Sequence, residues 1–312
     1  MTAPAALAFV RPAPSALDAA DELRTVRDLV RWSASRLTEA AVALGHGTDD
    51  PWDEAAWLVL WSLRLPPGQL EPVFEATLTR RERDAAVALV ERRCVERLPS
   101  AYLTGEAWLR GVRFLADPRA LVPRSPIAEV LDSDGLAPWI DDRDRVTRVL
   151  DLCTGGGSLA ILAAFAFPSS TVVGTDLSAG ALALAAENVA LHGLGARVTL
   201  RRGPLWAPVT GERFDLVVCN PPYVTDAAMA ALAAEYRHEP PAALGGGQDG
   251  MDLVRPIVSA ARERLNDGGV LLLEVGHERA HFEAAFPELP AVWLPTAGGD
   301  DRVVLLERST LP

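Results

Sequence analysis

The chain has 312 residues, of which 49% are apolar, and it carries a formal net charge of -12 at pH 7. Its length predicts more than one domain, and its acidic balance argues against a protein that grips nucleic acid by its phosphates. The sequence shows neither an apolar stretch long enough to span a bilayer nor a basic start followed by an apolar signal core, so we expect a cytoplasmic protein without a membrane partner.

The amino-terminal third predicts a helical module. Residues 1–15 are rich in Ala and Pro and are expected to be disordered. Apolar residues then recur at helical spacing, and helices are expected at residues 17–43, 53–63 and 79–95. These helices contain no catalytic constellation, so we interpret residues 16–98 as a substrate-recognition domain; the alternative is that the module only adds stability.

A hairpin linker is expected at residues 99–124, where short alternating segments are broken by Gly105, Gly111 and Pro118. Residues 125–312 then alternate between strands and helices, which predicts a doubly wound α/β domain. Strands are expected at residues 146–152, 171–175, 197–200, 214–219, 269–275 and 302–307. Helices are expected at residues 178–191, 227–236 and 251–265.

The first strand of this domain leads into a glycine-rich loop, Cys153-Thr154-Gly155-Gly156-Gly157-Ser158, and then into a helical pattern. The three glycines let the backbone turn tightly and approach a ligand closely, and Ser158 is expected to cap the helix. The next strand ends in Asp176, about 20 residues beyond Gly155, the spacing at which a carboxylate reaches the ribose of a nucleoside cofactor.

The glycine pattern alone leaves the cofactor open. Gly155, Gly157 and Ala160 also match the G-x-G-x-x-A fingerprint of nicotinamide enzymes, so a dehydrogenase is an alternative at this point. Asp151 lies just before the loop, and its carboxylate suits the cationic amino acid end of S-adenosylmethionine better than a pyrophosphate. A plain turn or cap residue is the simpler interpretation of Asp151.

The tetrapeptide Asn220-Pro221-Pro222-Tyr223 directly follows the apolar run 214–219, where a buried strand is expected to end. The prolines fix their own φ angles and push the residues before them toward extended geometry, so Asn220 and Tyr223 are presented in set directions. An incidental proline-rich strand exit is the alternative.

Such a corner suits methyl transfer to a planar nitrogen. The lone pair of an amide or aromatic amino nitrogen is delocalised, so the nitrogen is a poor nucleophile. If the Asn220 side-chain oxygen and the Pro221 carbonyl accept its two N–H bonds, the growing positive charge is stabilised and the nitrogen is aligned with the methyl group. The ring of Tyr223 is expected to stack on the flat acceptor group.

On these residues the chain resembles the glutamine N(5)-methyltransferases, and within them the branch that modifies ribosomal protein L-three rather than peptide release factors. The resemblance spans most of the chain. Besides the Asp151 loop and the Asn220 tetrapeptide, the matching segments are Ala101-Tyr102-Leu103-Thr104-Gly105-Glu106-Ala107-Trp108, Val122-Pro123-Arg124-Ser125-Pro126-Ile127-Ala128-Glu129 and Glu235-Tyr236-Arg237-His238-Glu239-Pro240. Release-factor enzymes typically carry Pro-Arg-Pro-Glu-Thr-Glu where this chain has Pro-Arg-Ser-Pro-Ile.

The resemblance implies a class I S-adenosylmethionine-dependent methyltransferase: a Rossmann-like sheet of seven strands with the last strand antiparallel, preceded by a helical domain. It implies S-adenosylmethionine as the donor, S-adenosylhomocysteine as the product, and no metal. The implied donor-binding residues are Asp151, Thr154, Gly155, Gly156, Gly157, Ser158, Asp176 and Asn220. The implied catalytic residues are Asn220, Pro221 and Tyr223, and Pro222 joins these three in binding the substrate.

The chain also departs from that family. Pro204 stands where many relatives carry an Asp positioned to accept from the adenine amino group, and Gly156 stands where Ser is usual. We therefore expect adenine to be held by apolar contact, with Leu205 and Trp206 as candidate walls; the alternative for Trp206 is a packed core position.

Three further patterns occur in the sequence. Residues 245–250 include four glycines and are expected to form a mobile loop near the substrate side. His277-Glu278-Arg279-Ala280-His281 matches the H-E-x-x-H zinc pattern, which we interpret as a solvated helix face. The cysteines at positions 94, 153 and 219 lack paired spacing, which predicts neither a disulfide framework nor a zinc site.

These observations lead to one functional hypothesis and two alternatives. The hypothesis is methylation of the side-chain amide of a glutamine in a basic protein, ribosomal protein L-three, which an acidic enzyme would attract. The first alternative is methylation of an exocyclic amino group of adenine or cytosine in DNA or RNA, although direct nucleic acid binding is not expected. The second is a catalytically silent S-adenosylmethionine-binding module acting in ribosome assembly, which Pro204 motivates.

Overall fold

The computed structural model describes residues 16–312, so the expected disorder of residues 1–15 lies outside the described residues. The chain divides after Thr104 into two compact units. Among the described residues, no helix combines the length and the apolar character that crossing a bilayer requires.

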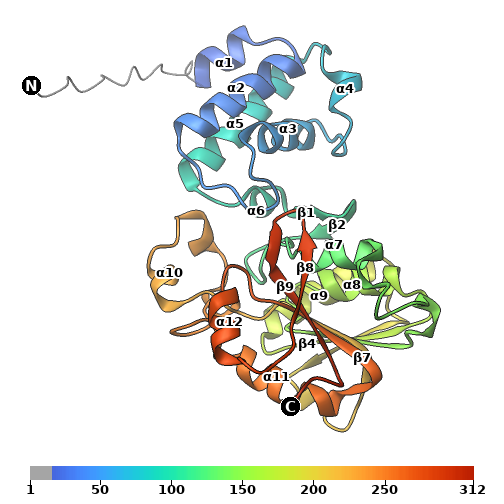
Figure 1. The fold of residues 1–312 in the computed structure, drawn as a ribbon. Helices are drawn as coiled ribbons and strands as arrows, with labels where there is room; N and C mark the ends of the chain where they lie inside the picture. Colours follow the sequence, from blue (N-terminus) through green and yellow to red (C-terminus); the bar gives the residue numbers. More distant parts are fainter. Residues whose placement is uncertain (1–15) are drawn as a thin grey trace, which may run out of the picture. The chain divides into compact units, whose positions relative to one another are not determined.

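The first unit is helical (Figure 1). Its helices are α1 (Ala16–Glu22), α2 (Val26–Glu39), α3 (Pro51–Ser62), α4 (Leu70–Val73), α5 (Arg80–Glu96) and α6 (Ser100–Thr104). The single helix expected over residues 17–43 is wrong. Thr25 has an extended backbone, its side chain accepts from the Asp28 amide, and the Asp28 carboxylate accepts from the Thr25 amide at 2.9 Å. This capping box starts a new helix, because it satisfies amide groups that a continuous helix would bond to its own preceding turn.

A buried ion pair joins three helices of the first unit. Arg93 on α5 donates to Glu54 on α3 at 2.6 Å, and their side chains are only 1% and 6% exposed. The Ser100 hydroxyl of α6 donates to the same carboxylate, and Arg93 also donates to the Ala43 carbonyl at 2.8 Å. Because unpaired buried charges are costly, these bonds fix how the helices are arranged around their apolar core.

The second unit is built on a seven-stranded sheet in the order β5-β4-β3-β6-β7-β9-β8. The strands are β3 (Arg148–Leu152), β4 (Thr171–Asp176), β5 (Val198–Arg202), β6 (Phe214–Cys219), β7 (Leu265–Glu274), β8 (Val292–Thr296) and β9 (Gly299–Glu307). The pairs among β3 to β7 are parallel, whereas β9 is antiparallel to both of its neighbours. This confirms the predicted sheet with its last strand antiparallel.

The structure contains one strand that was not predicted and a hairpin that was. The sequence prediction missed β8, which pairs only with β9 and contains Pro295; an edge strand tolerates a proline, but the proline weakens the strand signal. The hairpin of β1 (Glu106–Leu109) and β2 (Val112–Leu115) does form, and it belongs to the second unit.

The helices of this unit are α7 (Ile127–Asp132), α8 (Ser158–Ala166), α9 (Ala179–Leu191), α10 (Asp226–Ala230), α11 (Val254–Arg264) and α12 (Arg279–Ala285). The continuous helix expected over residues 227–236 is wrong, since α10 ends at Ala230 and a short 3-10 turn, Glu235–His238, follows. The Leu232 carbonyl, which a continuous helix would bond to the residue 236 amide, accepts from the Arg237 guanidinium at 3.1 Å instead.

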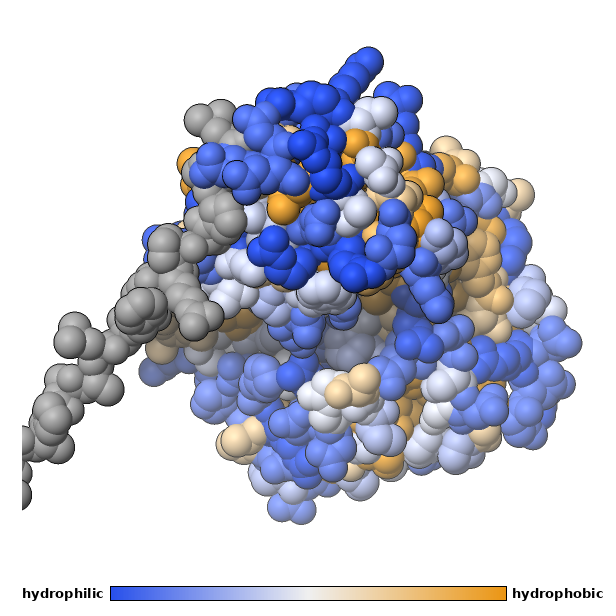
Figure 2. Space-filling view, turned by 90° about the horizontal axis from the view of Figure 1, so that it is seen from above, coloured by the Kyte–Doolittle hydropathy of each residue, from blue (hydrophilic) through white to orange (hydrophobic). Residues whose placement is uncertain are grey.

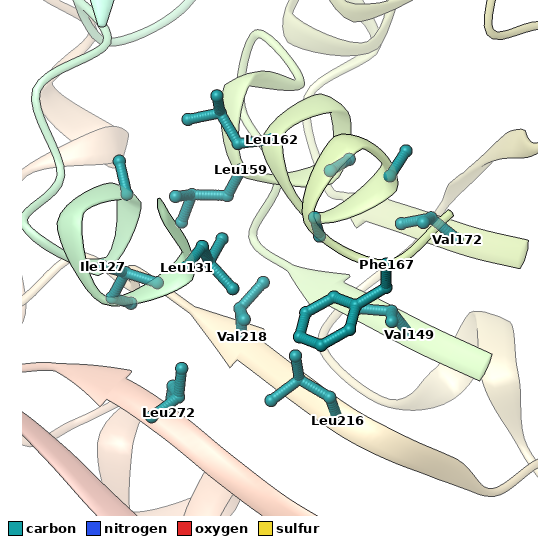
Figure 3. Close-up of a cluster of buried hydrophobic side chains, with 14 of the residues drawn as sticks. Ile127, Leu131, Val149, Leu159, Leu162, Phe167, Val172, Leu216, Val218 and Leu272 are labelled. Atoms are coloured by element: carbon teal, nitrogen blue, oxygen red, sulfur yellow. The ribbon is translucent and has the colours of Figure 1, made fainter. Parts of the chain in front are cut away.

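Alternate residues of each central strand enter two apolar layers, one on each face of the sheet. On β6, Leu216 and Val218 face α7 and α8, while Val217 and Cys219 face the layer that contains α11. Figure 3 shows the first layer, with Leu216 and Val218 directed toward the same space as Leu131 and Phe167. Burial on both faces explains why β6 reads as a continuous apolar run. On the face seen in Figure 2, by contrast, apolar residues appear in small groups among hydrophilic ones.

Candidate functional site

A cavity of about 370 Å³ opens at the carboxyl ends of the parallel strands. Its wall comes from the loops after β3, β4, β5 and β6, together with residues 119–125 and with Pro240, Ala242 and Ala243. This volume lies within the usual range for small-molecule sites, and the carboxyl edge of a doubly wound sheet is where such sites form.

The loop after β3 brings backbone to the cavity. Gly155 and Gly157 have φ angles of +54° and +83°, which glycine adopts without strain. A Cβ at Gly157 would lie 3.1 Å from the Ala185 Cβ, so this glycine also lets α8 start close against α9. Gly157 is the N-cap residue of α8, so the prediction that Ser158 caps the helix is wrong. Ser158 is the first helical residue and lines the cavity with Thr154, Gly155 and Gly156.

Asp151 lies behind this loop and not on the cavity wall. Its side chain is fully buried, and its Oδ2 accepts from the Thr154 hydroxyl at 2.5 Å and from the Ala160 amide at 2.8 Å. Burial raises the pKa of Asp151 to about 7, against the effect of these two bonds and with a further rise from the charge of Asp176. Asp151 thus organises the loop whose backbone faces the cavity. It can influence ligand binding through the position of Thr154 or through the charge of its own carboxylate.

Asp176 does reach the cavity, as its spacing predicts. Its two carboxylate oxygens accept from the Gly155 amide at 2.9 Å and the Ser178 amide at 2.8 Å, which holds the β3 and β4 loops together. Leu177 follows it on the wall and is 65% exposed.

The loop after β5 separates two neighbouring apolar residues. Leu205 lines the cavity next to Pro204 and has a left-handed φ of +43°. Trp206 does not reach the cavity; it is buried in the core with Val209 and Phe214. The interpretation of Trp206 as a cavity wall is corrected accordingly, because the turn at Leu205 directs the two side chains to different places.

Only part of the tetrapeptide after β6 lines the cavity. Asn220 and Pro222 line the cavity, whereas Pro221 and Tyr223 do not. The Tyr223 hydroxyl donates to Glu274 Oε1 at 2.8 Å, and burial raises the pKa of Tyr223 well above its usual value. The ring is thus anchored to Glu274 and half-buried, and its stacking on an acceptor stays a prediction.

Three glycines leave the space that Tyr223 occupies. A Cβ at Gly246 would lie 2.7 Å from the Tyr223 Cα, one at Gly250 would lie 2.2 Å from the Tyr223 carbonyl oxygen, and one at Gly276 would lie 2.3 Å from its ring. The glycine-rich segment is also tied to the chain after the corner: the Gly246 amide donates to the Val224 carbonyl at 2.8 Å. The glycines at positions 246 and 250 therefore serve close packing, and the mobility of residues 245–250 stays a prediction.

The sequence analysis missed the residues that fix the remaining wall, residues 122–125. Arg124 makes a two-pronged bond to Glu239, at 2.6 and 2.8 Å, and the Val122 amide donates to the same carboxylate at 3.0 Å. The Ser125 hydroxyl donates to Glu274. Arg124, Ser125 and Glu239 all lie in segments that carry the family resemblance, but a single sequence does not show which side chains pair.

The H-E-x-x-H pattern does not form a zinc-binding helix. His277 and Glu278 precede α12, and His281 pairs with Glu278 at 2.6 Å. Across residues 16–312, the structure contains no group of three His, Cys, Asp or Glu side chains arranged to hold a metal ion.

Comparisons with known proteins identify a matching family model and similar chains. The family model of the methyltransferase small domain matches residues 132–237. A ribosomal protein uL3 glutamine methyltransferase from Bordetella pertussis is 58% identical to this chain, over 93% of the chain and 97% of the relative. Proteins of the same name from Burkholderia pseudomallei and Neisseria gonorrhoeae are 53% and 47% identical, over 93% and 94% of the chain and 96% and 97% of the relatives.

The glycine cradle predicts a packing penalty. Gly246→Ala should lower the free energy of unfolding by about 2 kcal/mol, because the added methyl group would lie 2.8 Å from the Pro222 and Gly250 carbonyl oxygens and must displace backbone. Urea unfolding measures this. Gly195→Ala is the matched control, since its Cβ meets nothing within 4 Å. Equal unfolding curves for the two variants would show that the backbone around Tyr223 accommodates the methyl group without a loss of stability.

Proposed function

This chain belongs to the family of ribosomal protein uL3 glutamine methyltransferases, and on that premise we propose that it methylates the side-chain amide nitrogen of a glutamine in ribosomal protein uL3. S-adenosylmethionine is the methyl donor and S-adenosylhomocysteine the product. The observation that carries the proposal is the position of Asn220: it ends a buried strand and lines the same cavity as Gly155 and Asp176.

The donor side of the cavity fits S-adenosylmethionine. Asp176 offers a carboxylate at the spacing that suits ribose hydroxyls, and Leu177 and Leu205 supply apolar surface for adenine. The Asp151 carboxylate adds negative charge behind the loop, which favours a ligand carrying a sulfonium and an ammonium group. Adenine recognition at Pro204 then rests on apolar contact.

The bound donor supplies an activated methyl group, and the protein must present a nitrogen to it. We assign the two acceptors for the glutamine N–H bonds to the Asn220 side-chain oxygen and to the carbonyl oxygen of Pro221, which lies in the chain between the wall residues Asn220 and Pro222. Neither Pro221 nor Pro222 has an amide hydrogen to compete for these acceptors. The acceptors stabilise the charge that develops on nitrogen and hold its lone pair in line with the methyl carbon, so no strong base is needed before attack.

The protein substrate accounts for the charge of the enzyme. A net charge of -12 attracts a basic protein and repels phosphate backbones, which supports a basic ribosomal protein over a nucleic acid. With such a substrate we propose a cytoplasmic enzyme. Screening by salt should slow the encounter.

Peptide mapping by mass spectrometry after incubation of uL3 with isotopically labelled donor tests the function. We expect one labelled glutamine. Asn220→Ala should lower kcat by about 10² to 10³-fold while donor affinity stays nearly constant, because the lost acceptor acts on the developing charge.

Asn266→Ala is the matched control for Asn220→Ala, since its side chain bonds Asp215 near the start of β7. Label on a nucleobase, or donor binding without transfer, would replace the proposal with one of the two alternatives. Equal loss of donor binding and transfer in Asn220→Ala would give Asn220 a different role.

The pKa of Asp151 gives donor binding a pH dependence. In the free protein this carboxyl is half protonated near a pH of about 7, and a cationic donor favours its charged form. Donor affinity should therefore rise as pH increases from about 6 to about 8, with release of a proton, and then level off. Calorimetry in two buffers of different ionisation enthalpy measures the proton, and Asp151→Asn should abolish both effects. An unchanged pH slope in that variant would assign the effect to another group.

We further propose that the helical unit recognises uL3. It has its own apolar core, and the residues assigned to donor and acceptor binding all lie in the second unit. A chain that starts at Gly105 should keep its donor affinity, which serves as the folding control, and its KM for uL3 should rise by about tenfold or more. Unimpaired methylation by this shortened chain would leave the helical unit with stability as its role.

A further inference from the structure

Glu274 is a buried carboxylate outside the residues assigned to donor and acceptor binding. It is the last residue of β7, and its neighbour Leu273 is paired with Cys219, the last residue of β6. Glu274 therefore lies at the level of the sheet where the tetrapeptide begins. It is only 4% exposed and does not line the cavity.

Its two oxygens bind two separate parts of the cavity wall. Oε1 accepts from the Tyr223 hydroxyl at 2.8 Å, which fixes the residue after the wall residue Pro222. Oε2 accepts from the hydroxyl of Ser125, itself a wall residue and 5% exposed. One carboxylate thus joins segments that lie 51 and 149 residues away along the chain.

The ionised carboxylate is the form that suits this arrangement. Two hydroxyls can both donate only if both oxygens accept, as they do in a carboxylate. Burial raises the pKa of Glu274 and opposes ionisation, whereas the bonds from Ser125 and Tyr223 and the charges of Arg124 and Arg302 favour it. A glutamine has the same shape but offers one oxygen and an amide group that only donates, so one hydroxyl would lose its acceptor.

We propose that Glu274 is a positioning residue for methyl transfer. It does not touch either reactant; it sets the location of the Asn220 corner relative to residues 122–125 by holding Tyr223 and Ser125. The inference rests on the proposed function for its kinetic consequence, because orientation is the main source of acceleration in a reaction without a strong base, and small displacements of reacting groups cost large factors in rate.

The test combines Glu274→Gln, Tyr223→Phe and the double variant in the uL3 methylation assay. Each single change should lower kcat by about tenfold to a hundredfold with donor affinity within about twofold, and the double variant should lose less than the product of the two single losses, because Glu274 and Tyr223 belong to one hydrogen-bond network. The proposal would be overturned if the kcat loss of the double variant equalled the product of the two single losses, or if Tyr223→Phe kept full activity.

Asp215→Asn is the matched control. Asp215 lies near the start of β6, and its carboxylate accepts from the amides of Thr147 and Arg148 at 2.8 and 3.0 Å. This variant should lower the melting temperature and leave kcat unchanged. If it lowers kcat as Glu274→Gln does, the kcat loss reports general stability and the positioning role is refuted.

Hydrogen exchange separates this inference from the proposed function. In Glu274→Gln the amides of Val122, Arg124, Ser125, Tyr223 and Val224 should exchange at least about tenfold faster than in the unmodified protein, whether or not uL3 is the substrate. Failure of the unmodified protein to methylate uL3 would refute the function alone. Unchanged exchange at these amides would refute the role of Glu274 alone.

Discussion

The shape of the cavity wall depends on buried carboxylates. Because water does not reach them, they must accept hydrogen bonds from donors within the protein. Asp151, Glu239 and Glu274 are each at most 4% exposed, and each accepts from groups in the loops that form the wall. A buried carboxylate without partners costs several kcal/mol, so the loops that supply the donors are drawn to defined places. The wall is therefore fixed by carboxylates that do not themselves line the cavity.

Close packing around Tyr223 restricts the conformation of the corner in addition to the hydrogen bonds. Tyr223 is bound at its hydroxyl by Glu274, and its backbone and ring fill spaces that exist only because residues 246, 250 and 276 are glycines. With the two prolines before it, the corner has few alternative conformations. A reaction that relies on aligning a delocalised nitrogen benefits from such stiffness, since the orientation is established when the protein folds and not when the substrate binds.

The sequence predicted the features that depend on local pattern. Central strands such as β6, the glycine loop and Asp176 follow from apolar runs and from spacing along the chain, and the structure places them as expected. It failed where distant contacts decide. The edge strand β8 has a weak signal because of Pro295, and the direction of the Tyr223 side chain depends on Glu274, 51 residues away. The break at Thr25 was readable in principle, because Thr25 and Asp28 form a local capping pattern.

The two sides of the cavity are held over very different lengths of chain. On the donor side, Asp151 bonds residues 3 and 9 positions away, and Asp176 bonds one 21 positions away. On the acceptor side, Arg124 and Glu239 are 115 positions apart, and Ser125 and Glu274 are 149 apart. Closing long loops costs more entropy and requires the intervening elements to be in place. The donor loop is therefore held mainly by nearby parts of the chain, whereas the acceptor corner reaches its geometry only when distant segments of the second unit have come together. A glycine motif thus reveals the donor site in the sequence, while the acceptor geometry is visible only in the fold.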